Sequence, residues 1–198
     1  GHAGYCELNY TPQNNEGKTM IKRAIEINEM FEVSLQFWAY LDKKYSKFDS
    51  KKFLKKTPHI SFVWGEKNVE SLRQRFLVLK KQPLFKEMEF TKDYKKIKNW
   101  SPLLIEGRES NDNIAATKVA HGTDVNFGEL TSQLLKILTK NKNFKLSLNT
   151  NVTKIKATNE QKWIINTTNN KLNKKLMHES SLVFIGAGGM AINLLQKM

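Results

Sequence analysis

The stretch "SLVFIGAGGMAINLLQKM", residues 181–198, decides which fold to expect. An apolar run ends in a glycine-rich turn, and an apolar pattern with helical spacing follows. The order strand, Gly186-x-Gly188-x-x-Ala191, helix matches the alanine form of a dinucleotide-binding fingerprint. Glycines in such a turn let the backbone approach a pyrophosphate, and the free N–H groups at the helix start bind it. The same pattern is equally typical of a strand-to-helix turn in any α/β core, so on its own it leaves the ligand open.

Length and composition suit a globular chain. The sequence has 198 residues, 39% of them hydrophobic, enough for one large domain or two small ones with a buried core. The apolar runs are far shorter than the roughly 20 residues that a membrane-spanning helix needs, and no amino-terminal stretch has the pattern of an export signal. A single cysteine, Cys6, fits a reducing compartment. The first residue is not methionine, and we interpret the sequence as a piece of a longer protein.

The net charge is strongly positive, at +14. Charge of this size suits a nucleic acid or an anionic membrane surface as partner. The lysines, however, are spread along the whole chain and rarely interleave with arginines or aromatic residues, unlike a nucleic-acid-binding stripe. We therefore expect no nucleic acid partner, and we expect the positive field to attract an anionic substrate. A basic nucleic-acid-binding module remains the alternative of another class, and it predicts salt-sensitive binding.

Apolar spacing predicts a mixture of helices and strands. Residues 18 to about 44 form an amphipathic helix, since apolar residues recur there every three or four positions. Pro58 precedes a strand, His59–Trp64, and a second helix runs on to Pro83. The other predicted elements are a helical turn at 93–100, a helix at 129–140, and strands at 88–92, 114–119, 144–148, 152–157, 163–167, 174–177 and 182–185. The expected class is α/β, with α+β character because strands follow one another late in the chain.

Five runs of sequence together resemble one family, the FAD-dependent malate:quinone oxidoreductases. They are "GHAGYCELNYTP" (1–12), "TPHISFVWGEKNVESLRQRF" (57–76), "WSPLLIEGR" (100–108), "AATKVAHGTDVNFGELTSQL" (115–134) and "FIGAGGMAINLLQK" (184–197). The runs occur in the family's order, at about its spacing, and cover nearly the whole chain.

The resemblance implies the middle portion of a two-domain FAD-dependent oxidoreductase of the glutathione-reductase/D-amino-acid-oxidase type, without its N-terminal βαβ unit. Residues 1–16 would be a loop segment of the FAD domain, and residues 17–114 a substrate domain of helices and sheet strands. Residues 115–198 would return to the FAD-binding domain and carry a strand-rich insert. The "FIGAGG" run would be a return strand touching the cofactor, and this piece alone would be inactive.

The resemblance also implies a reaction. (S)-malate would be oxidised to oxaloacetate by hydride transfer to FAD, and the electrons would pass to a membrane quinone, a step of the tricarboxylic acid cycle. The enzyme would be cytoplasmic and peripherally associated with the inner face of the cell membrane, where its lysines could meet anionic lipid. A sister enzyme oxidising a 2-hydroxyglutarate-type acid is the nearer alternative.

This chemistry needs a base for the hydroxyl proton and donors for two carboxylates. His59 is the candidate base, because an imidazole titrates near neutrality and its strand directs it to the face of Ser61 and Val63. A structural histidine at a strand edge is the alternative reading. Arg108 is a candidate carboxylate clamp, or else a surface arginine. We expect Arg73 and Arg75, on the second helix, to be solvated.

The run "HGTDVNFG" contributes two more candidates, Asp124 and Asn126, because the corresponding turn of related flavoenzymes approaches flavin and substrate. Either residue could instead cap the following helix. His121 lies outside the family's motif and ranks lower. Cys6 is expected to be a small buried residue, and no metal is expected. The resemblance assigns cofactor binding to Gly1, His2, Ala3, Val152, Gly186, Ala187 and Gly188.

Overall fold

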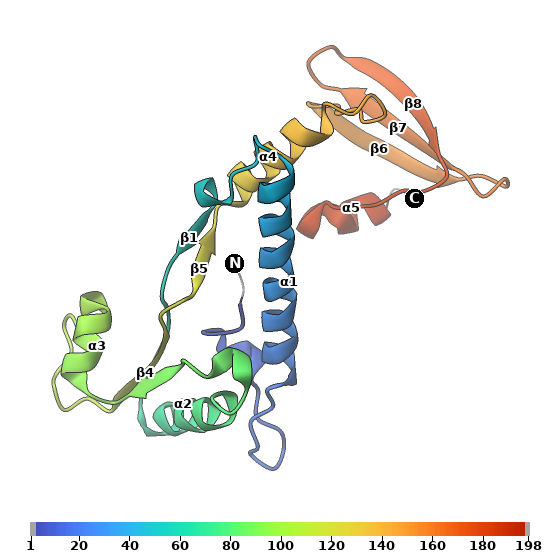
Figure 1. Cartoon of the computed structure of the whole chain (residues 1–198). Coiled ribbons are helices and arrows are strands. Elements are labelled where there is room, and N and C mark those ends of the chain that lie inside the picture. Colours follow the sequence, from blue (N-terminus) through green and yellow to red (C-terminus); the bar gives the residue numbers. More distant parts are fainter. Residues whose placement is uncertain (1–2, 197–198) are drawn as a thin grey trace. The chain divides into compact units, whose positions relative to one another are not determined.

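A computed structural model describes residues 3–196, and the chain divides into two compact units, Gly1–Leu138 and Thr139–Met198 (Figure 1). The fold is mixed α and β, as predicted, and every strand pair in the described part of the chain is antiparallel. None of the described helices has the length and apolar character needed to span a bilayer. The assignment of residues 1–16, 17–114 and 115–198 to functional domains stays a prediction.

A three-stranded sheet forms the centre of the first unit. Its order is β2 (His59–Trp64), β4 (Ile114–Val119) and β3 (Glu89–Thr91), with His59 opposite Val119. Successive side chains of a strand point to opposite faces, so each face packs against a different helix. Helix α2 (Glu66–Leu79) covers the face of Val63, and α3 (Tyr94–Trp100) covers the face of Phe62. The predicted elements at 59–64, 88–92, 93–100 and 114–119 are confirmed.

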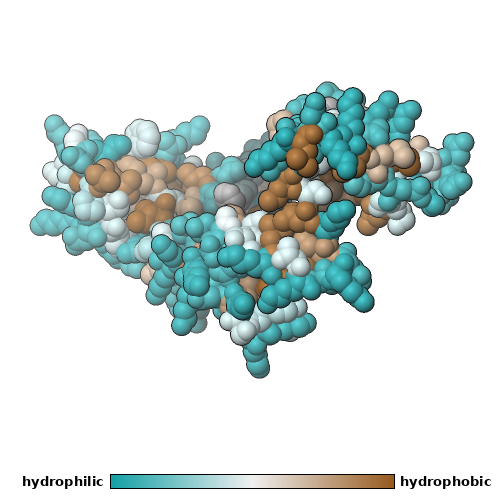
Figure 2. All heavy atoms as spheres, turned by 90° about the horizontal axis from the view of Figure 1, so that it is seen from above, coloured by the Kyte–Doolittle hydropathy of each residue, from teal (hydrophilic) through white to brown (hydrophobic). Residues whose placement is uncertain are grey.

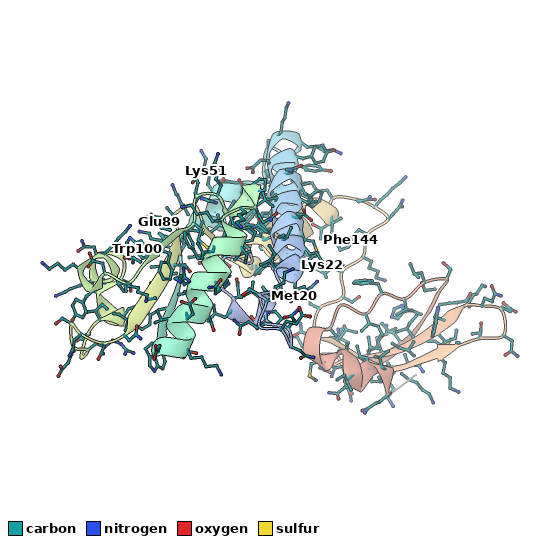
Figure 3. The ribbon with its side chains drawn as sticks, turned by 90° about the horizontal axis from the view of Figure 1, so that it is seen from below. Met20, Lys22, Lys51, Glu89, Trp100 and Phe144 are labelled. Carbon is teal, nitrogen blue, oxygen red and sulfur yellow. The ribbon has the colours of Figure 1, made fainter. Side chains whose placement is uncertain are left out.

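A lysine fastens α3 to the edge of this sheet. Lys96 donates to the carboxylate of Glu89 on β3 over 2.8 Å, and its ammonium lies 5.2 Å from the centre of the Trp100 ring. Figure 3 labels Glu89 and Trp100 on this part of the molecule. The contact is exposed at both ends, so we expect it to stabilise the helix by well under about 1 kcal/mol.

The long helix α1 (Lys22–Lys44) supplies the other half of the core. It buries Ala24, Phe31, Trp38 and Leu41, and the Trp38 ring meets Phe53 edge to face at 5.5 Å. The helix begins at Lys22 rather than at residue 18, because the residues before it form a tight turn. In that turn the Asn14 side chain accepts from the backbone N–H groups of Glu16 and Lys18.

A two-stranded ribbon links the sheet to the next helix. Strands β1 (Leu54–Lys56) and β5 (Thr123–Val125) pair, with Lys55 opposite Asp124. The sequence analysis did not predict this ribbon. Helix α4 (Phe127–Leu138) follows it and starts two residues earlier than predicted, because Asn126 Oδ1 accepts from the N–H of Glu129 at 3.1 Å. The helix-capping interpretation of Asn126 is therefore confirmed.

The second unit is built on its own antiparallel sheet of β6 (Thr150–Ala157), β7 (Trp163–Asn169) and β8 (Lys174–Ser180), followed by the short helix α5 (Ala191–Leu195). The predicted strands at 144–148 and 182–185 are wrong. A strand needs a neighbour for its backbone groups, and within residues 3–196 no ladder pairs with either segment. Local bonds replace the ladder: the Ser180 hydroxyl accepts from the Leu182 N–H and donates to the Leu182 carbonyl.

Apolar side chains also reach the surface. Figure 2 shows a largely hydrophilic surface interrupted by apolar patches. In the second unit, Leu182 and Phe184, which stand in the segment wrongly predicted to be a strand, are exposed, Phe184 to 90%. An apolar run in the sequence therefore predicts a strand only where a second element covers it.

Gly4 permits a close approach between the amino-terminal segment and α1. Its φ is +70°, and a Cβ at this position would lie 2.6 Å from the carbonyl oxygen of Ala24. Both the backbone conformation and the available space exclude a side chain. The amino-terminal segment therefore packs directly against the backbone of α1 at this point.

We predict that Gly4→Ala lowers the free energy of unfolding by roughly 2–4 kcal/mol, because positive-φ strain and a clash with backbone combine. The matched control is Gly107→Ala, where φ is +75° but nothing lies within 4 Å of the added Cβ. That control reports the strain alone, about 1 kcal/mol. Urea denaturation of both variants measures the difference, and equal losses would contradict the close approach.

Candidate functional site

The segment Ala3–Cys6 crosses the first unit as irregular backbone, and side chains satisfy its carbonyl groups. Asn28 on α1 donates to the Ala3 carbonyl at 2.6 Å. Arg75 on α2 donates to the carbonyls of Gly4 and Tyr5 at 3.3 and 2.9 Å. Ser61 on β2 donates to the Cys6 carbonyl at 2.9 Å. Four consecutive carbonyls are thus held by three different elements, since a buried carbonyl left unpaired costs about 1–3 kcal/mol.

The prediction that both arginines are solvated is confirmed for Arg73 and wrong for Arg75. Arg73 is exposed and pairs with Glu70 at 2.9 Å. Arg75, in contrast, is only 2% exposed, on the same helix face as Leu72 and Leu79. Carbonyl and hydroxyl oxygens compensate its charge, while burial lowers the pKa of the guanidinium to about 10. Because basic residues are abundant in this chain, nothing in the sequence distinguished the buried Arg75 from the solvated ones.

Tyr5 is the centre of an aromatic cluster that the sequence analysis overlooked. Its side chain is buried, and its ring meets His59, Phe85 and His121 edge-on, with centroids 5.8, 5.5 and 5.4 Å apart. Burial raises the pKa of the Tyr5 phenol, so the hydroxyl keeps its proton at neutral pH.

The hydroxyl of Tyr5 begins a chain of polar contacts that ends at the surface. It lies 3.1 Å from His121 Nε2, and His121 Nδ1 lies 3.2 Å from the carboxylate of the exposed Glu87. A carboxylate only accepts, so in the neutral ring Nδ1 carries the proton and Nε2 accepts from Tyr5. His121, which was ranked low from the sequence, therefore contacts the same Tyr5 ring as His59.

The orientation of His59 is fixed by the turn that follows β4. His59 Nε2 lies 3.1 Å from the carbonyl oxygen of Thr123, which can only accept, so in the neutral ring Nε2 carries the proton. A Cβ at Gly122 would lie 2.5 Å from His59 Cδ2, so only glycine fits beside the imidazole. The "PHISF" strand and the "GTDVNFG" turn thus lie side by side, as a shared site requires.

The remaining ring nitrogen of His59, Nδ1, is buried and carries a lone pair in this tautomer. Nδ1 has no hydrogen-bond partner among the described residues, which is also true of the buried Asn28 Oδ1, Arg75 Nη1 and Thr123 hydroxyl. A buried polar group without a partner is rare in proteins and asks for an explanation. A lone pair on a neutral imidazole is a proton acceptor, so this position is chemically suited to a general base.

The other candidates lie apart from His59 or have other partners. Arg108 packs on the opposite face of β2, with its guanidinium 5.1 Å from the rings of both Phe62 and Trp64. Asp124 is exposed on β5 and stands opposite Lys55. Asn126 is exposed and caps α4. The structure therefore brings the "GTDV" turn to His59 but separates Arg108 from it.

The cofactor candidates fall in both units. Gly1 and His2 lie outside the described residues, Ala3 is fully buried, and Val152 is half-buried on β6 opposite Thr167. Gly186, Ala187 and Gly188 follow β8, and nothing lies within 4 Å of a Cβ placed at Gly188. Other glycines of the described chain, among them Gly107, have the same open space, so the cofactor assignment stays a prediction. In the described part of the chain, no cluster of three or more His, Cys, Asp or Glu residues could hold a metal.

The geometry is that of a mixed α/β protein with a buried histidine, His59, whose Nδ1 has no partner among the described residues, and with a glycine-rich turn after β8. The chain belongs to the malate:quinone oxidoreductase family, whose model matches residues 1–198. The family resemblance noted in the sequence is thereby confirmed.

Individual relatives agree with the family match. Proteins named "Probable malate:quinone oxidoreductase" are 46% identical in Wigglesworthia glossinidia brevipalpis, 45% in Tolumonas auensis and 47% in Geobacillus sp.. These matches cover 100%, 99% and 100% of this chain, but only 39%, 40% and 38% of the respective relatives. The chain therefore spans about two fifths of the length of these relatives.

Cys6 provides a test of how tightly the segment Ala3–Cys6 is held. Burial raises the pKa of its thiol to about 11 from 9.0. The folded state therefore keeps a proton that the unfolded state loses above pH 9, so this contribution to stability is present below pH 9 and lost as pH rises through 11. We predict that alkylation of Cys6 in the folded protein rises with a midpoint near pH 11, and near pH 9 in urea. A folded-state midpoint near pH 9 would contradict the burial, and Cys6→Ser is the blank.

Proposed function

We propose that the protein containing this chain is an FAD-dependent enzyme that oxidises malate to oxaloacetate and passes the electrons to a quinone. The family match over the whole chain and the names of the relatives support the proposal. Of the structural observations, the unpartnered Nδ1 of His59 carries it, because alcohol oxidation needs an acceptor for the hydroxyl proton.

In this proposal His59 takes the substrate's hydroxyl proton on Nδ1. The bond from Nε2–H to the Thr123 carbonyl holds the ring in the tautomer that leaves Nδ1 free, and it strengthens as the ring becomes positively charged. Nδ1 exposes almost no surface, so substrate reaches it by a shift of the side chains around the imidazole. The net charge of +14 favours the approach of a dicarboxylate.

FAD, when bound, supplies the acceptor for the two electrons that leave the substrate. The backbone of Gly186, Ala187 and Gly188 would hold it, with Val152 as a further contact in the second unit. The resemblance to the family in the run 184–197 supports this assignment. The fold we propose for the complete chain is the two-domain flavoprotein type, with residues 17–114 in the substrate domain.

We place the enzyme at the cytoplasmic face of the cell membrane, bound peripherally. The excess of lysine and arginine over acidic residues, 33 against 19, suits attraction to anionic lipid head groups. A quinone acceptor dissolved in the bilayer would require this location.

The direct experiment is expression of the full-length chain, followed by an absorption spectrum and an assay of malate-dependent quinone reduction. The proposal predicts a yellow protein with a flavin spectrum that reduces a soluble quinone analogue when malate is added. A colourless protein that folds and does not oxidise malate would refute it.

We predict that His59→Ala lowers kcat for malate by a factor on the order of 10²–10⁴, the usual contribution of a general base. The bound FAD, measured by absorbance, should be unchanged because the substitution leaves the proposed FAD-binding residues 186–188 intact. Arg108→Lys is the control, since Arg108 packs on the other face of β2. Turnover retained in His59→Ala would remove this residue from the mechanism, and a large rise in KM for Arg108→Lys would restore the clamp role of Arg108.

A further inference from the structure

Arg75 is the only fully buried charged side chain among the residues that the structure describes. None of the ion pairs in that part of the chain includes it. A buried charge is costly unless nearby opposite charge and hydrogen bonds offset it; here the Glu7 carboxylate acts on the guanidinium from a distance, Nε and Nη2 are hydrogen-bonded, and Nη1 has no partner among the described residues. The groups that accept hydrogen bonds from Arg75 therefore indicate what this buried side chain contributes to the structure.

All of these partners belong to the amino-terminal segment. Nη2 donates to the carbonyls of Gly4 and Tyr5, and Nε donates to the Thr11 hydroxyl at 2.9 Å. Thr11 in turn donates to the Leu8 carbonyl at 3.1 Å. Because the guanidinium is a rigid planar fork, it fixes the two ends of residues 4–11 relative to each other and to α2.

The same segment carries the ring that packs on the proposed base. Arg75 holds the carbonyl of Tyr5, and the Tyr5 ring meets the His59 imidazole edge-on. Ser61, two residues after His59 on the same face of β2, holds the next carbonyl, of Cys6. A shift of this backbone would therefore move the Tyr5 ring away from His59.

We propose that Arg75 is a positioning residue, which fixes residues 4–11 so that the Tyr5 ring holds the His59 imidazole in its productive orientation. This role rests on the proposed function, in which His59 takes the substrate proton. In this role Arg75 acts through the backbone of residues 4 and 5 and through the Tyr5 ring.

Three variants of the full-length protein separate this role from general stability. Arg75→Met removes the donors and keeps an apolar side chain of similar length in the core. Arg73→Met is the matched control on the same helix, because Arg73 is exposed and bonds only to Glu70. Thr11→Val removes one acceptor of the fork and serves as the milder variant if Arg75→Met does not fold.

The first measurement is amide hydrogen exchange. We expect exchange in residues 4–11 to be at least about tenfold faster in Arg75→Met, and faster by a smaller factor in Thr11→Val, with residues 66–79 unchanged. Arg73→Met should match the wild type. Unchanged exchange in residues 4–11, or a uniform rise over the whole chain, would overturn the proposal.

The second measurement is a double-mutant cycle on kcat per bound FAD. We expect Arg75→Met to lower kcat on the order of tenfold to a hundredfold with little change in KM, and to have no further effect in a His59→Ala background. If the fold-losses in kcat of the two single variants multiply in the double variant, Arg75 does not act through His59. If the wild type oxidises no malate, the proposed function fails, and hydrogen exchange alone then decides the positioning role.

Discussion

Everything in the first unit depends on how four consecutive carbonyls, those of Ala3 to Cys6, find donors in the protein interior. The segment forms no helix or strand, so Asn28, Arg75 and Ser61 must supply the bonds that a ladder would give. Those donors lie on α1, α2 and β2, so their hydrogen bonds connect all three elements to one irregular segment of backbone. Gly4 completes the arrangement, because only a residue without a side chain fits against α1.

The position of the His59 imidazole depends on how the segment Ala3–Cys6 is held. The tethered segment carries Tyr5, whose ring borders His59 on one side while Gly122 and the Thr123 carbonyl border it on the other. The imidazole is thus held by residues from the start of the chain and from the turn after β4. Its Nδ1 keeps a lone pair without a partner in the described part of the chain. A histidine held in this way keeps a ring nitrogen on which a proton can be accepted, and this is the role proposed for it above.

Local pattern predicted the helices around residues 22–44 and 66–79 and the strand His59–Trp64, because each shows a clear period of three to four residues or a compact run of strand residues. It failed where structure depends on a distant partner. Strand β1, with the sequence Leu-Lys-Lys, has no strand signal of its own and exists only by pairing with β5. Residues 182–185 have the signal but no partner strand in residues 3–196. Tyr5 was missed and His121 was ranked low for the same reason, since the two residues meet across 116 positions of sequence.

The claim that the fold presents His59 as a proton acceptor is tested most directly by ¹⁵N NMR of the full-length protein with labelled histidine. The His59 signals are assigned by their loss in a His59→Gln variant. The account predicts that the neutral ring carries its proton on Nε2 and that Nδ1 has the shift of an unprotonated, weakly bonded nitrogen. A proton found on Nδ1, or rapid averaging between the two nitrogens, would contradict it.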